Sequence, residues 1–87
     1  MGIEYTLRVP AAAQEAVVAA LAEHLMPMLL RLDPRASEPF PNVYANPEAH
    51  GLYICDNQTD PAVAAEVIRS AIDLLLLYSP SVSISRE

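Results

Sequence analysis

The apolar and polar positions along this chain follow two periods in turn. Alternation of apolar and polar residues is typical of a strand with one buried face, and a repeat of three to four residues is typical of an amphipathic helix. Residues 3–9, 43–55 and 82–86 alternate, whereas residues 11–32 and 61–78 show the helical repeat. Turn residues divide the middle alternating segment in two. The pattern therefore predicts the element order β-α-β-β-α-β.

This order predicts an α+β fold of the ferredoxin-like type, a two-layer sandwich with two helices on one face of a four-stranded antiparallel sheet. A chain of 87 residues is long enough for a single domain, which we expect to span residues 1–87. Right-handed crossover connections place both helices on the same face of the sheet. The main alternative keeps these elements but forms a strand from residues 28–33, after a break in the first helix.

The first predicted helix contains a proline and two apolar residues on its solvent side. We expect this helix to begin at Pro10, since proline suits a first helical position. Pro27 lacks an N–H group and clashes with the preceding turn, which predicts a kink, or a break near Leu25. Met26 and Leu30 face solvent on a straight helix. Either a kink turns them inward or they form an exposed apolar patch.

The middle of the chain predicts a loop followed by a hairpin. Residues 33–41 contain three prolines and no periodicity, and we expect Phe40 to fasten this loop to the domain. Two short strands, 42–45 and 52–55, flank a six-residue turn. Because that turn is longer than the commonest hairpin loops, the hairpin is expected to project.

The second predicted helix has clear start and stop signals and one misplaced apolar residue. Asp60 is a strong N-cap candidate and Pro61 suits the first turn. Ser79 and Pro80 end the helix. Leu77 falls in the middle of its polar face, which predicts an exposed apolar side chain.

Composition restricts the classes of partner. Eleven acidic residues face five arginines and no lysine, for a net charge of −6. This charge repels phosphate backbones and anionic lipids, so we expect neither nucleic acid nor membrane as a partner. A hydrophobic content of 53% is high for a short chain and favours a protein partner. No basic, apolar leader segment opens the chain, so a cytoplasmic location is expected.

Few residues have the chemistry of a catalytic or metal site. Cys55 is the only cysteine, which excludes an internal disulfide and a cysteine-rich metal site. His24 and His50 show no metal-ligand spacing. The residues after the first strand, 9–13, form neither a Gly-rich anion loop nor a C-x-x-C motif. We therefore predict no catalytic residue, no metal and no cofactor.

Tyr44 and Tyr53 lie on the predicted hairpin and could line the uncovered face of the sheet. Aromatic residues on the central strands of such sheets stack RNA bases in some proteins, but the acidic charge opposes that role. Contact with a protein is the better functional interpretation. A role in capping the sheet edge is the structural alternative.

The sequence as a whole predicts a small acidic, non-enzymatic binding protein that acts through protein–protein association. An immunity- or antitoxin-type inhibitor of a basic toxin fits, and so does a small regulatory subunit. Self-association, as a homodimer, is expected through the second helix or a sheet edge. The predicted interface residues are Leu77, Met26, Leu30, Tyr44 and Tyr53. The alternative is a small-ligand-binding or enzymatic homodimer, with a pocket between helices and sheet that draws on His24, His50 and Cys55.

Overall fold

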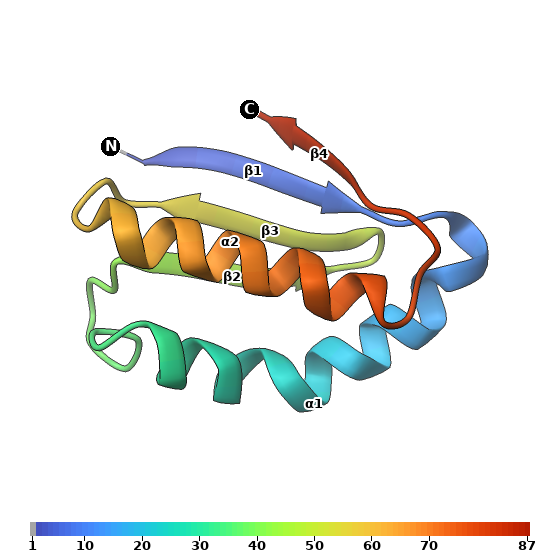
Figure 1. Ribbon diagram of the computed structural model, residues 1–87, viewed down its shortest axis with the longest axis horizontal. Coiled ribbons are helices and arrows are strands. Elements are labelled where there is room, and N and C mark those ends of the chain that lie inside the picture. Colours follow the sequence, from blue (N-terminus) through green and yellow to red (C-terminus); the bar gives the residue numbers. More distant parts are fainter. Residues whose placement is uncertain (1) are drawn as a thin grey trace.

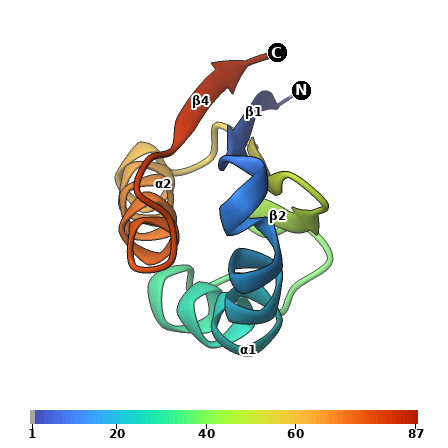
Figure 2. The same cartoon turned by 90° about the vertical axis from the view of Figure 1, so that its right-hand side faces the viewer.

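The computed structural model describes residues 2–87 and shows an α+β fold of two layers (Figure 1). Neighbouring strands of its four-stranded sheet are all antiparallel, in the order β2-β3-β1-β4. Both helices lie against one face of this sheet and pack on each other (Figure 2). The predicted fold class is confirmed at this level. The elements are β1 (Ile3–Arg8), a 3-10 turn η1 (Ala11–Ala13), α1 (Gln14–Leu32), β2 (Val43–Glu48), β3 (Gly51–Asp56), α2 (Pro61–Leu76) and β4 (Ser83–Arg86).

The core lies between the sheet and the two helices, and the periodicity of each element explains its members. Successive strand residues point to opposite faces, so β1 and β3 direct alternate apolar residues at the helices. Each fully buried side chain of this size stabilises the fold by about 1.5–3 kcal/mol relative to exposure. The largest fully buried apolar side chains are Leu7, Leu21, Leu52, Ile54, Leu75, Val17 and Val67.

Helix α1 differs from the prediction at its start and at its proline. Pro10 has a helical φ of −56° but an extended ψ of 151°, so it precedes the 3-10 turn, and α1 begins only at Gln14. The helix then continues through Pro27 to Leu32, as one ribbon in Figure 1. The predicted break near Leu25 and the alternative strand at 28–33 are both wrong. Packing of the buried stripe on either side of the proline outweighs the one hydrogen bond that it removes.

The hairpin is tighter than predicted. Strands β2 and β3 extend to Glu48 and Gly51, so the connection has only two residues and the six-residue turn is wrong. Pro47 continues the strand because it pairs with Leu52 at a position whose backbone N points away from β3. Proline is tolerated at such outward positions of an edge strand, because no ladder hydrogen bond is lost there.

Helix α2 begins as predicted. The side chain of Asp60 accepts a hydrogen bond from the N–H of Val63 at 3.2 Å, and Pro61 is the first helical residue. By contrast, Phe40 does not fasten the loop to the domain, because its side chain is 78% exposed. Among the described residues, no helix has the length and hydropathy needed to cross a membrane.

Candidate functional site

A groove of about 570 Å³ lies between α1 and α2. Residues three and four apart on a helix share one face, so each helix presents one row of side chains to this groove. The row on α1 includes His24, Met28 and Arg31, and the row on and after α2 includes Asp73, Leu74 and Leu77.

The groove has an apolar floor and a rim that combines an apolar residue with charged ones. Met28 is only 5% exposed and forms part of the floor. Leu77, directly after the last residue of α2, is 76% exposed at the rim. Within residues 2–87, neither Arg31 nor Asp73 forms an ion pair or a side-chain hydrogen bond. Both charges are therefore available to a bound molecule.

Pro27 lies in the groove wall, and sequence reasoning treated it only as a possible helix breaker. Because proline lacks an N–H, the backbone carbonyl of Glu23 loses its usual helical donor. Pro27 is exposed and lines the groove, so solvent or a bound molecule can reach this part of the helix.

The other predicted interface residues on the helical side lie outside the groove. Met26 and Leu30 are 57% and 55% exposed. Of the two predicted alternatives, the exposed apolar patch is therefore correct, and no kink turns these side chains inward. Met26 and Tyr44 line a second hollow of about 260 Å³, between α1, the 33–42 loop and β2. Leu30 does not line this hollow and is exposed on α1. Met26 and Tyr44 thus line the same hollow, whereas Leu77 lies on a different surface.

The face of the sheet without helices carries the two tyrosines. Tyr53 donates a hydrogen bond to the Oε1 of Glu4 at 2.6 Å. This hydrogen bond is the main reason why the pKa of the Tyr53 hydroxyl is raised well above its ordinary value, with burial as the second. The ring of Tyr44 packs edge-on against Tyr53, with centroids 6.2 Å apart. Tyr53 is thereby held in place, and Tyr44 remains 51% exposed.

The two histidines and the cysteine occupy separate surfaces. His24 lines the groove between the helices, whereas His50 lines a different hollow near Gln14. Cys55 lies on β3, where it pairs with Glu4 and Tyr44 across the sheet. No group of three metal-binding side chains occurs among residues 2–87. The structure does not bring these three residues together in a pocket between helices and sheet.

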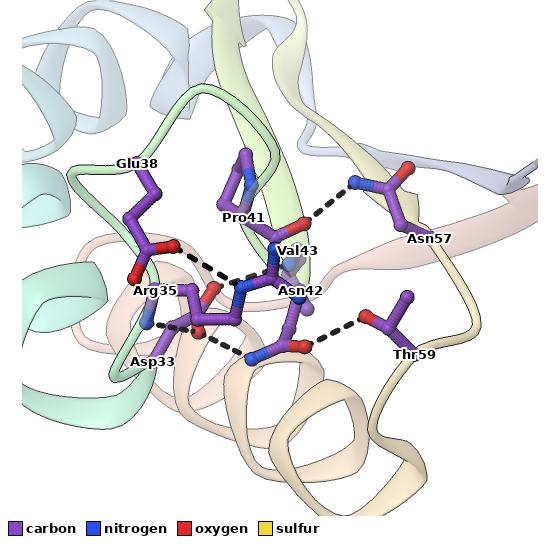
Figure 3. Close-up of polar contacts among 8 residues, drawn as sticks. All are labelled: Asp33, Arg35, Glu38, Pro41, Asn42, Val43, Asn57 and Thr59. Atoms are coloured by element: carbon purple, nitrogen blue, oxygen red, sulfur yellow. Dashed lines mark hydrogen bonds and ion pairs between the residues drawn. The ribbon is translucent and has the colours of Figure 1, made fainter.

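A buried polar network at the end of α1 was missed by sequence reasoning (Figure 3). The carboxylate of Asp33 accepts hydrogen bonds from the N–H of Arg35 at 2.9 Å, the side chain of Asn42 at 2.8 Å and the N–H of Val43 at 3.2 Å. Burial alone would raise the pKa of Asp33, but these hydrogen bonds hold it below the usual value of 3.8. The hydroxyl of Thr59 donates to the Oδ1 of Asn42 at 2.6 Å.

This network joins the start of β2 to the segment between β3 and α2. Asn57 donates from its side chain to the carbonyl of Pro41 at 2.8 Å and from its backbone to the carbonyl of Asn42 at 3.1 Å. Every buried side-chain polar atom among the described residues has a partner. Perturbed carboxylates often mark functional sites, but here the donors that lower the pKa belong to the loop after α1 and to the first residue of β2. The network therefore positions the loop.

The groove between the helices combines volume, exposed apolar surface and available charges. No family model, curated protein or solved structure compared with this chain matches it. The case for a function therefore depends on the chemistry of the surfaces described above.

Proposed function

We propose that this chain is a small acidic binding protein that acts through association with another protein, and that the partner binds in the groove between α1 and α2. The observation that carries the proposal is Leu77, whose side chain is 76% exposed beside a buried apolar floor. Exposed apolar surface rimmed by polar residues, at a concave hollow, is a mark of a binding site.

Charge favours a basic partner. The net charge of −6 steers a positively charged protein towards the chain and repels acidic ones. At the groove itself, Asp73 offers a carboxylate and Arg31 a guanidinium, both without an intramolecular partner within the described residues. A partner with an apolar anchor flanked by both signs of charge would complement this groove. An inhibitor of a basic toxin and a regulatory subunit are the two roles that fit.

The test is affinity capture from the native host with the full chain, followed by binding measurements with the captured protein. Leu77→Glu should weaken binding at least tenfold, because it places a carboxylate where an apolar contact forms. The matched control is Val18→Glu, which likewise replaces an apolar side chain with a carboxylate, at an α1 residue that is 43% exposed and outside the groove. Equal binding by wild type and Leu77→Glu would remove the groove as the binding site.

A small ligand in the same groove is the second candidate. The volume of about 570 Å³ lies within the range of roughly 300–1,000 Å³ for ligand pockets. His24, Arg31 and Asp73 could orient a polar ligand. A protein partner is favoured because the most exposed groove residue is a leucine at the rim, where a small ligand would leave it in water. Binding of no protein by wild type would favour the ligand.

We further infer that the domain is of the ferredoxin-like type. The element order along the chain and the central position of β1 and β3 in the sheet support this assignment. It adds no functional information, because unrelated functions share such folds.

A further inference from the structure

The outer edge of β4 presents unpaired backbone groups. In an antiparallel sheet, successive residues of a strand direct their N–H and C=O groups to opposite sides. The N–H of Glu87 donates to the carbonyl of Glu4 at 2.8 Å, so Ser85 and Ser83 also bond towards β1. Ile84 and Arg86 consequently direct their N–H and C=O groups away from the sheet. β4 is the last strand of the sheet, and nothing in residues 2–87 pairs with that edge.

The opposite edge of the sheet is protected. On β2 the outward-directed residues are Val43, Ala45 and Pro47, since the N–H of Asn57 bonds to the carbonyl of Asn42. The N–H of Val43 donates to Asp33, and Pro47 has no N–H to offer. Proline and local capping are the usual means by which proteins block edge-to-edge pairing. β4 has neither proline nor lysine, so its edge is the less protected of the two.

Apolar surface lies beside the open edge. The side chain of Ile84 is 50% exposed on the sheet face that carries the helices, where its strand partner is the buried Leu7. On α2, the flank opposite the groove carries Ile68, Ile72 and Leu76, each one turn apart. Leu76 is 47% exposed. Figure 2 shows α2 between α1 and β4, so this flank lies on the β4 side.

We propose that two copies of this chain form a symmetric dimer in which their β4 strands pair antiparallel and join the two sheets into one. The register is centred on Ser85, which lies opposite Ser85 of the second copy. Ile84 then exchanges both of its backbone hydrogen bonds with Arg86 of the second copy, and the reverse. All four outward N–H groups of the two strands are satisfied.

The strand itself favours a second copy over an unrelated strand. The symmetric register places Ile84 of each copy on the helix side of the joined sheet, the side on which α2 lies. Arg86 lies opposite an isoleucine rather than opposite another arginine, so no like charges face each other directly. Arg86 and Glu87 balance locally, although the chain as a whole is acidic. The groove of the proposed function lies on the other flank of α2, so both surfaces can be occupied at once.

Sedimentation of the full chain across a range of concentrations tests the dimer. Wild type should dimerise, and Ile84→Lys should raise the dissociation constant at least tenfold, because it places charges beside the symmetric contact. Ala19→Lys adds the same charge at an exposed position of α1 and should leave dimerisation unchanged. Leu77→Glu should also leave it unchanged, which separates this dimer from binding in the groove. A monomeric wild type, or a dimer insensitive to Ile84→Lys, would overturn the proposal.

A disulfide tests the register. Ser85 and its copy form a pair without mutual backbone hydrogen bonds, where Cβ atoms approach most closely. In a Cys55→Ser background, Ser85→Cys should oxidise to a covalent dimer. Ser83→Cys should not, because Ser83 lies opposite Glu87 of the second copy. Cross-linking through Ser83→Cys, or no cross-linking through Ser85→Cys, would overturn this register. If β4 paired with a strand of an unrelated protein instead, neither a wild-type dimer nor the cross-link would form.

Discussion

At the scale of single residues, Asp33 shows how one buried carboxylate fixes a loop that has no regular structure. Its oxygens accept from two backbone N–H groups and one side chain, and its side chain is 1% exposed. The hydrogen bonds stabilise the ionised form, so the folded state holds this carboxylate at a lower pKa than the unfolded chain does. Because the pKa of Asp33 is lower in the folded state, its ionised carboxylate stabilises the fold.

Asp33→Asn should lower the free energy of unfolding by about 1–3 kcal/mol near neutral pH, because an amide cannot accept all three hydrogen bonds. The contribution of the ionised carboxylate is fully present above the unfolded pKa and is lost as the pH falls through the lower, folded pKa. The difference between wild type and variant should therefore shrink below about pH 3.8. Urea unfolding as a function of pH measures it. Asp73→Asn, at an exposed site, is the control, and a constant difference at all pH values would contradict the argument.

Gly51 is the second residue whose identity the fold requires. Its φ is +150°, and a Cβ atom at this position would clash with the carbonyl oxygen of Leu7. Gly51→Ala should cost about 1–3 kcal/mol of stability or more, since both backbone strain and a backbone clash oppose it. Thermal unfolding measures the loss. Ala49→Gly, in the same turn, should cost less than half as much, and equal losses would contradict a special role for Gly51.

At the scale of elements, Pro27 tests whether α1 tolerates its proline only through packing. Pro27→Ala restores the N–H that the carbonyl of Glu23 lacks, so the helix should gain roughly 1–3 kcal/mol. Chemical denaturation measures the gain. Pro34→Ala, in the loop after the helix, should give no such gain. A less stable Pro27→Ala would mean that the ring itself is required by the groove wall.

The helices and strands were predictable where their residues repeat with one period. They were less predictable where contacts with residues distant in the chain decide the extent of an element. The helical repeat placed Leu77, Met26 and Leu30 on the solvent side, and all three are exposed. The extent of β2 was not predictable, because Pro47 fits only at an outward position of an edge strand, and sequence does not show which strand is at the edge. The role of Asp33 was not predictable either, because it depends on contact between the end of α1 and the start of β2 in the folded chain. An aspartate directly after a helix, before a loop rich in proline, was its only local signal.

At the scale of the whole molecule, net charge gives the two proposed associations opposite responses to salt. Each copy carries −6, so a dimer brings like charges together, whereas a basic partner brings opposite charges together. Raising the salt from about 0.03 to about 0.3 M shortens the screening length and weakens both effects. Sedimentation should therefore show tighter dimerisation at high salt, and the captured partner should bind more weakly. Dimerisation that weakens with salt would point to opposite charges paired across the contact, which the proposed register does not provide, because it sets Arg86 opposite Ile84 and Glu87 opposite Ser83.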